Sequence, residues 1–451
     1  MARIHYCDIG DYLSREEKLK ILADADGLQN IAWRIIEPNE KHDWINQRGN
    51  VFDSFVSIGA KRDKDTETVF ETYSRGAETC RDAWCYNFSQ KQLATNMKRM
   101  IGFYNEQVEG FKERKEWDKE LKADNFVSND PTKISWSSSL KNLFQRFIKS
   151  EFSKTSIVTA MYRPFCKCHT YFDNHWTHRV GQFPQIFPEP DMENLMISVC
   201  GVGGSKSLTP LMHNTIVDLN FQEAGAQCFP LYTYDTSLSA QSELFQQSEL
   251  FQRTRRENIS DAMLQKFRKK YGDLTKEDIF YYVYGILHSE SYKTRFAPDL
   301  KKQLPRIPMV DDFWTFSKSG RKLGELHVNY ETLKPYPLKE IVTGTTPNFK
   351  VVKMVFPSKQ DKSRIIYNGN LTLDGIPAET YQYIVNGKPA IEWIMERYQV
   401  TTHKDSGITN DPNDWCREHN NDRYIVDLIK RVVHLSVESV KIINRLPELG
   451  F

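Results

Sequence analysis

The chain has 451 residues, of which 39% are hydrophobic and 12% aromatic, and this composition excludes an intrinsically disordered protein. Its 61 lysines and arginines against 59 acidic residues give a formal net charge of +2. That balance neither favours nor excludes a nucleic-acid partner, because a basic face can lie within a neutral total. No stretch approaches the ~20 consecutive apolar residues that cross a bilayer, and the N-terminus lacks the apolar middle of a secretory signal. We therefore expect a soluble cytoplasmic protein without membrane contact.

The first sixty residues contain two short structural signals. "RIHYCDIGD" predicts a strand that begins close to the first residue, and "SREEKLKIL" predicts a helix with Ser14 as its N-cap and Glu17 at the third position. A strand and a helix in this position are typical of the end of a larger sheet domain.

Two amphipathic helices are predicted next. The first begins at Ser89, and one face of it carries apolar side chains at Leu93, Met97, Met100, Ile101 and Tyr104. The second lies within 135–154, where apolar residues again form a stripe and Lys141, Arg146 and Lys149 lie off it. Residues 162–188 show no periodicity and predict a long structured loop or a set of short strands.

Three short strands are predicted after residue 190, in "LMISVCGVG", "HNTIVDLNF" and "QCFPLYTY". The chain then repeats Ser-Glu-Leu-Phe-Gln directly at 242–252. Two copies are too few for a solenoid, and the serine- and glutamine-rich surroundings indicate a surface linker or insertion over 241–258.

The stretch "IFYYVYGILHSESYKTRF" at 279–296 concentrates tyrosine, histidine and cationic side chains, so it is a candidate for either an active site or a buried helix. Thr275 and Asp278 form a capping-box variant in front of it. Apolar positions Ile279, Tyr282 and Val283 then follow a helical period. Catalysis would need a partner and a cleft that the local sequence does not supply, so we predict a helix in the core.

The C-terminal part mixes strand and helix signals. "FKVVKMVF" and "SRIIYNGNLTL" predict strands, with Asn368-Gly369 in a tight hairpin turn of positive φ. "PAIEWIMERY" and "DRYIVDLIKRVVHLSVESVKIINRL" predict helices. The whole pattern favours an α+β fold, in which helices are mixed with short antiparallel or mixed sheets in two subdomains.

Known catalytic and cofactor motifs are absent from the sequence. "GVGGSKSL" at 201–208 lacks the spacing of a phosphate-binding loop, and there is no dinucleotide fingerprint. An amino-methyltransferase motif would need Asn/Asp-Pro-Pro-Tyr/Phe, which neither "NDPT" nor "NDPN" provides. We therefore predict no catalytic and no cofactor-binding residue in this chain.

Cysteine usage gives no metal site. The eight cysteines have no framework spacing, which is typical of a reducing compartment. Cys166-Lys167-Cys168-His169 is the tightest cluster, but a zinc site usually needs a second such pair and none is evident. We predict that no metal is bound.

Cations alternate with aromatic residues from 75 to 180, and this combination is the strongest functional signal. Lysine and arginine neutralise phosphates, while arginine also reads base edges. The alternative is an ordinary solvated surface over an aromatic core. The aromatic members are Trp84, Trp136, Tyr162, Phe165, Tyr171 and Trp176.

Several long strings resemble one family. "YSRGAETCRDAWCYNFS", "KISWSSSLK", "YRPFCKCHTYFD", "KEDIFYYVYGILHSESYKTRFAPDLKKQLPRIP" and "YQYIVNGKPAIEWIMERYQVTTHKDSGITNDPNDW" are similar to the C-terminal part of type ISP restriction–modification enzymes, which act in bacterial defence. The resemblance extends over essentially the whole chain. In that family a single polypeptide carries a nuclease, a helicase-type translocase, an adenine-N6 DNA methyltransferase and a target-recognition domain.

The resemblance implies a domain order. Residues 1–60 would be the C-terminal tail of the methyltransferase domain, a residual piece of its α/β fold. Residues 61–240 would be the DNA-facing part of the target-recognition domain, 241–258 its linker, and 259–451 its helical and hairpin scaffold. S-adenosylmethionine, ATP and Mg would belong to the complete enzyme and not to this chain. The chain would thus be a fragment, a split gene product or an expressed piece.

The resemblance also implies a partner and a site. The partners would be double-stranded DNA and a methyltransferase domain, in cis or in trans. The residues expected to contact DNA are Arg75, Thr79, Arg81, Ser137, Ser139, Lys141, Arg146, Lys149, Arg163, Lys167, His169 and Arg179. Two alternatives stay open, namely a protein-interaction scaffold that docks on a separate catalytic subunit and a divergent autonomous DNA methyltransferase.

Overall fold

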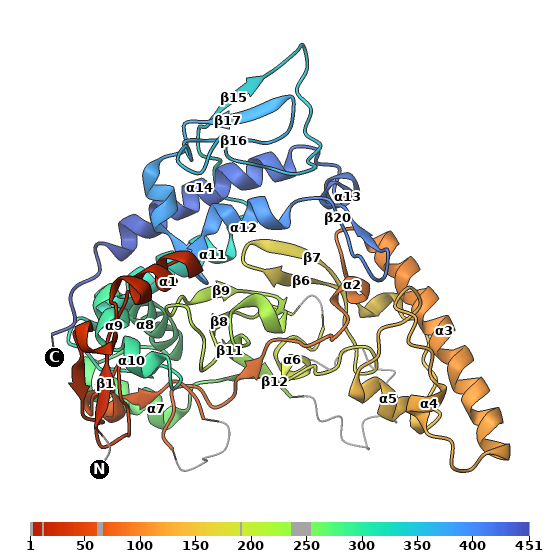
Figure 1. The fold of residues 1–451 in the computed structure, drawn as a ribbon, viewed down its shortest axis with the longest axis horizontal. Helices are drawn as coiled ribbons and strands as arrows, with labels where there is room; N and C mark the ends of the chain where they lie inside the picture. Colours follow the sequence, from red (N-terminus) through yellow and green to blue (C-terminus); the bar gives the residue numbers. More distant parts are fainter. Residues whose placement is uncertain (1–2, 11–12, 61–65, 190–191, 236–253, 451) are drawn as a thin grey trace.

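The computed structural model describes residues 3–10, 13–60, 66–189, 192–235 and 254–450. Helices and several small sheets are mixed along the chain, so the predicted α+β class is confirmed. Figure 1 shows both termini on the same side of the molecule, with the long helix α3 on the opposite side and the sheet of β15, β16 and β17 above α14.

The N-terminal strand and helix form as predicted. Strand β1 (Ile4–Tyr6) pairs antiparallel with β2 (Arg34–Ile36). Helix α1 (Arg15–Asp24) lies between them and is followed by the short 3-10 helix η1 (Leu28–Asn30). The Ser14 hydroxyl accepts from the Glu17 amide at 3.2 Å, and the Glu17 carboxylate accepts from the Ser14 amide at 2.7 Å. These reciprocal bonds fix where the helix begins.

Residues from 51 onward pack with the second half of the chain. After η2 (Val51–Ser54), strand β3 (Val56–Ser57) pairs with β14 (Arg306–Ile307). Phe52 is fully buried, and its ring centroid lies 5.2 Å from that of Phe296. Residues before 60 thus already pack against the second half of the chain, and the boundary at 60 stays a prediction.

Two four-stranded sheets occupy the middle of the molecule. One has the order β4 (Ser74–Arg75), β11 (Gln227–Pro230), β8 (Met196–Val199) and β9 (Leu211–His213), with antiparallel neighbours throughout. The other has the order β10 (Ile216–Val217), β6 (Ile157–Arg163), β7 (Cys166–Tyr171) and β5 (Tyr86–Asn87), and its β10–β6 pair is parallel. The β6–β7 hairpin accounts for the start of the segment 162–188. Cys166 and Cys168 are each 1% exposed on its inner face, so both pack in the core.

Helices cover one end of these sheets. They are α2 (Asp82–Cys85), α3 (Gln90–Trp117), α4 (Ala123–Phe126), α5 (Ser138–Gln145) and α6 (Phe183–Ile186), with η3 (Lys154–Ser156) and η4 (Leu219–Phe221) in the connections. The Ser89 cap and all five predicted face residues of α3 are confirmed, because those five side chains are buried. Helix α5 ends well before the predicted position, since Phe147 adopts a positive φ of 56°.

The predicted linker is only partly described. The repeat at 242–252 lies outside the described residues. Near the end of the predicted linker 241–258, residues 255–257 form strand β13 (Arg255–Glu257), which pairs antiparallel with β12 (Tyr232–Tyr234).

A group of helices follows: α7 (Asp261–Tyr271), α8 (Lys276–His288), α9 (Glu290–Arg295), α10 (Ala297–Leu300) and α11 (Phe313–Val328). The predicted core role of α8 is confirmed, because every residue from Ile279 to His288 is buried. Thr275 and Asp278 form the expected capping box. The tyrosine and histidine side chains of this helix are therefore buried in the core.

The C-terminal part contains β15 (Lys339–Val342), β16 (Arg364–Ile366), β17 (Leu371–Asp374), η6 (Ala378–Gln382), β18 (Ile384–Val385), β19 (Lys388–Pro389), α12 (Ala390–Arg397), β20 (Thr401–Thr402), β21 (Thr409–Asn410), α13 (Pro412–Glu418) and α14 (Tyr424–Ile443). Both predicted helices and the hairpin β16–β17 are confirmed.

Two local predictions in this part were wrong. "FKVVKMVF" forms no strand beyond an isolated bridge from Val355 to Ile366. The turn at Asn368-Gly369 has no positive φ. Instead the Asn368 side chain accepts from the backbone amides of Asn370 and Leu371, at 2.9 and 2.8 Å, so a side chain closes the turn.

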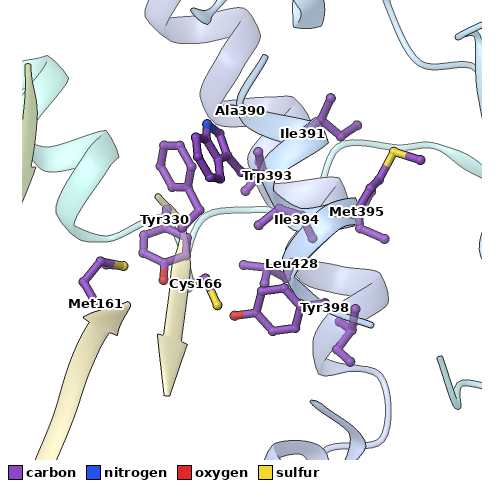
Figure 2. Close-up of a cluster of buried hydrophobic side chains, with 14 of the residues drawn as sticks. Met161, Cys166, Tyr330, Ala390, Ile391, Trp393, Ile394, Met395, Tyr398 and Leu428 are labelled. Carbon is purple, nitrogen blue, oxygen red and sulfur yellow. The ribbon is translucent and has the colours of Figure 1, made fainter. Parts of the chain in front are cut away.

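One hydrophobic core joins the two halves of the chain. Figure 2 shows side chains of the β6–β7 hairpin beside those of α12 and α14, and the labelled members include Met161, Cys166, Tyr330, Trp393, Ile394, Tyr398 and Leu428. Residues far apart in sequence thus share one buried cluster. Among the described residues, no helix is both long enough and apolar enough to span a membrane.

Helices α8 and α11 cross at glycines. A methyl group on Gly320 would overlap the carbonyl oxygen of Tyr281, and one on Gly285 would overlap that of Phe316. We expect Gly320→Ala to lower the free energy of unfolding by about 2–3 kcal/mol, because the backbones would have to separate. Urea unfolding measures this loss.

Gly102→Ala in α3 is the matched control, because a methyl group there meets no atom within 4 Å. It should instead stabilise the protein by up to about 1 kcal/mol through helix propensity. Equal stability of the two variants would contradict the close crossing.

Candidate nucleic-acid interface

Three segments of the predicted DNA-facing part converge in space: 74–82, 135–149 and 173–182. Glu78 and Arg179 exchange backbone hydrogen bonds of 3.0 Å in both directions. Gly181 has a positive φ of 61°, and a methyl group on it would overlap the Ser74 hydroxyl. A methyl group on Gly76 would lie 2.5 Å from the carbonyl oxygen of Asp218, which lies outside these three segments. Glycine is therefore required where these backbones meet.

Arg81 connects the three segments from inside. Its side chain donates from Nε to the Ser135 carbonyl at 3.0 Å, from one terminal nitrogen to the Ser137 hydroxyl at 2.7 Å, and from the other to the Trp176 carbonyl. Arg81 is only 3% exposed, and this burial lowers the pKa of its guanidinium from the ordinary value. The whole fork is directed into the protein, so Arg81 has an internal role, and its contact with DNA stays a prediction that this burial does not favour.

The neighbouring hydroxyl groups have structural partners. Thr79 is buried and donates to the Asp82 carboxylate. Ser137, also buried, accepts from the Leu140 amide at 3.3 Å and so caps α5. Both side chains are buried, so their DNA contacts likewise stay predictions that the structure does not favour. Half-buried Ser139 lies 2.8 Å from Nδ1 of His178.

The cationic residues of the β6–β7 hairpin hold other parts of the chain. Arg163 pairs with Asp218 at 2.6 Å. Lys167 pairs with Glu331 at 2.5 Å, and Nε2 of His169 lies 3.3 Å from Glu418. Burial lowers the pKa of His169. These side chains are only 12–14% exposed, so they are poorly placed to contact a ligand. Lys167 and His169 connect the two halves of the chain, whereas Arg163 pairs within the first half.

The remaining candidates are accessible. Arg75 and Arg179 border the same hollow of about 160 Å³, and Arg179 is 63% exposed with Nε 3.7 Å from Glu78. Arg146 is exposed just after α5 and forms no ion pair within the described ranges. Lys149 is exposed beside Glu109, and Lys141 is partly exposed, 2.5 Å from Asp124. The four most accessible cations are therefore Arg75, Arg146, Lys149 and Arg179.

One segment beside this region, 399–410, was not expected from the sequence. It contains the β20–β21 hairpin and closes over α2 and β5, where the Phe88 amide donates to the Asn410 side chain at 2.9 Å. A cavity of about 700 Å³ lies between them, with Asp82 and Tyr162 on one wall and Lys404 on the other. Glycine at position 407, where φ is +67°, is the sequence signal for the turn of this hairpin.

Arg81→Lys tests the internal role of the guanidinium. Lysine keeps the charge, but its single nitrogen cannot reach three acceptors that surround a planar fork. We expect the free energy of unfolding to fall by about 2 kcal/mol, since buried acceptors lose their donors. Chemical denaturation measures the change. The control is Arg179→Lys at an exposed position, where the change should stay within about 0.5 kcal/mol, and equal effects would contradict the assignment.

The chain was compared with known proteins. A family described as the Type ISP C-terminal specificity domain matches residues 68–428. No curated protein matches the chain. One similar solved structure is a nuclease-deletion mutant of the Type ISP restriction-modification enzyme LlaGI in complex with a DNA substrate mimic, with 36% identity, a TM-score of 0.85, and coverage of 99% of this chain and 39% of that one.

Two further structures are similar. The ATP-dependent Type ISP restriction-modification enzyme LlaBIII bound to DNA has 34% identity and a TM-score of 0.86, with coverage of 99% of this chain and 28% of that one. The DrdV–DNA complex has 28% identity and a TM-score of 0.82, with coverage of 100% and 44%. The chain thus spans less than half the length of each of the three. Because the family match covers most of the chain, this protein belongs to the Type ISP C-terminal specificity domain family.

Proposed function

We propose that this chain recognises a short sequence in double-stranded DNA, as the target-recognition part of a restriction–modification enzyme. The observation that carries the proposal is the identity of 34–36% over 99% of the chain to two enzymes whose structures contain DNA or a DNA mimic. The four accessible cations of the candidate interface support it, because lysine and arginine are the side chains that neutralise phosphates.

In the proposed interface, some residues contact DNA and others hold those residues in place. Arg75 and Arg179 project from backbones fixed by glycine contacts and by paired hydrogen bonds, so their forks suit bidentate recognition of a base edge or a phosphate. Arg146 and Lys149, after α5, suit phosphate contacts. Arg81 lies beneath them as a positioning residue.

We further propose that residues 1 to about 50 dock on a methyltransferase domain, in cis or in trans. Helix α1 has no buried residue. Its surroundings expose large apolar side chains, among them Leu22, Leu28, Trp33 and Trp44, and Leu28 is 72% exposed. An apolar surface of this kind is typical of a protein–protein interface. S-adenosylmethionine, ATP and Mg would be bound by the missing domains, and the assembled enzyme would act in the cytoplasm.

A duplex pool with a randomised centre tests DNA recognition. We expect the purified chain to select a subset of the pool, and its affinity to fall with salt by about one log–log unit per phosphate contact. Absence of any salt-sensitive duplex affinity, both alone and with a methyltransferase domain added, would overturn the proposal.

Single substitutions test the assigned contacts. Arg75→Ala and Arg179→Ala should each weaken binding to the selected duplex by about 1–3 kcal/mol if they read bases. Arg256→Ala is the control, since Arg256 is similarly exposed on β13 and pairs with Asp235 at 2.7 Å. Equal effects of the three variants would show that the contacts lie elsewhere.

Two measurements separate the alternatives. Calorimetry with S-adenosylmethionine should show no binding to this chain, whereas an autonomous methyltransferase would bind it. A scaffold would co-purify with its catalytic subunit and be indifferent to duplex DNA.

A further inference from the structure

Three metal-ligand side chains meet where segments 74–82 and 173–182 join. Glu78, Cys80 and His178 each offer a ligand atom, and these atoms all lie within 4.8 Å of one another. None of the three is among the expected DNA contacts. The Cys80 thiol and the nearest Glu78 carboxylate oxygen are 3.5 Å apart.

The spacing suits a small divalent ion. Zinc binds sulfur at about 2.3 Å and nitrogen or oxygen at about 2.0–2.2 Å, so two ligand atoms on a tetrahedral ion are about 3.5 Å apart. The Cys80–Glu78 pair already has this separation. The third ligand atom lies within 4.8 Å of the other two, and side-chain rotation at half-buried and exposed positions can bring it closer.

The backbone holds the ligands in place. Glu78 is paired with Arg179, the residue after His178, by two backbone hydrogen bonds of 3.0 Å. Arg81, the residue after Cys80, is tied to the carbonyl of Trp176. Both hydrogen-bonded links therefore run beside the cluster and fix the separation of its two segments.

Cys80 itself has an unusual conformation. Its φ of +57° lies in the left-handed region, which a residue with a Cβ rarely adopts. Such strain persists where the surrounding structure imposes it and is frequent at functional positions.

The histidine has a support of the kind that metal ligands use. The Ser139 hydroxyl lies 2.8 Å from Nδ1 of His178, and within the described part of the chain Nε2 forms no hydrogen bond. Histidine ligands are commonly oriented by a hydrogen bond to the other ring nitrogen. Nε2 is therefore the ring nitrogen that is available to an ion.

We propose that Glu78, Cys80 and His178 bind one divalent transition ion of the zinc class, with water in the fourth position. The sulfur ligand excludes a calcium or magnesium site, since these ions take oxygen ligands. A cysteine binds such an ion as the thiolate, so the ion displaces one proton when it binds. The ion also withdraws Glu78 from Arg179, whose Nε is 3.7 Å away.

Titration with cobalt(II) under reducing conditions tests the site on the full chain without DNA. We expect one ion per chain, a thiolate-to-cobalt charge-transfer band and displacement by zinc(II). Cys80→Ser should abolish the band, and His178→Gln should weaken binding on the order of a hundredfold, while Ser139→Ala should weaken it about tenfold. Cys7→Ser is the control, because Cys7 is a free thiol in the N-terminal piece, and it should leave both readouts unchanged.

Binding without a thiolate band, or a band that persists in Cys80→Ser, would overturn the proposal. Circular dichroism of each variant establishes that it is folded, and Glu78→Gln provides a second, conservative variant with an expected loss of about tenfold. Since DNA is absent from the titration, its failure would leave the proposed DNA recognition untouched.

Discussion

The arrangement of the candidate interface depends on one buried guanidinium. Arg81 donates to Ser135, Ser137 and Trp176, and these contacts bring together backbone segments that are not neighbours in any sheet. A planar fork with donors on several sides is suited to this task, because each acceptor approaches from its own direction. The exposed arginines and the Glu78–Cys80–His178 cluster both lie on segments that Arg81 holds.

The two halves of the chain are joined by apolar and by ionic contacts. The shared core places the β6–β7 hairpin against α12 and α14 (Figure 2). Lys167 and His169, on the other face of β7, reach Glu331 and Glu418 of the second half. Alternation along one strand explains this division, since successive side chains point to opposite faces. The second half therefore fixes the orientation of the half that carries the interface.

The sequence predicted best what depends on local signals. Helices α1, α3 and α8 begin at their predicted caps, and the buried period of α8 correctly placed its tyrosines in the core. The strand predicted at 349–356 does not form: some of its apolar residues pack in the core, Val352 and Val355 are exposed, and a single bridge to Ile366 is its only ladder contact among the described residues. Strand formation depends on a partner strand, and local composition does not reveal it.

The contacts of individual polar residues were less predictable from the sequence. Arg81 reaches acceptors 54 and 95 positions away, and Arg163 finds Asp218 55 positions away. The sequence does not show whether a cation in an aromatic-rich stretch faces solvent or a carbonyl oxygen. The sequence therefore proposed a candidate region, whereas the contacts of each side chain show which of its residues are exposed and which are internal.

The glycine crossing of α8 and α11 has a consequence for how such a protein can diversify. Because the two backbones touch directly at Gly285 and Gly320, the helices leave no room for a larger side chain at either position. The segments that carry Arg75, Arg146 and Arg179 lie outside this crossing. Substitutions at these exposed arginines are therefore expected to leave the crossing of α8 and α11 unchanged, provided that Arg81 and its hydrogen bonds are kept.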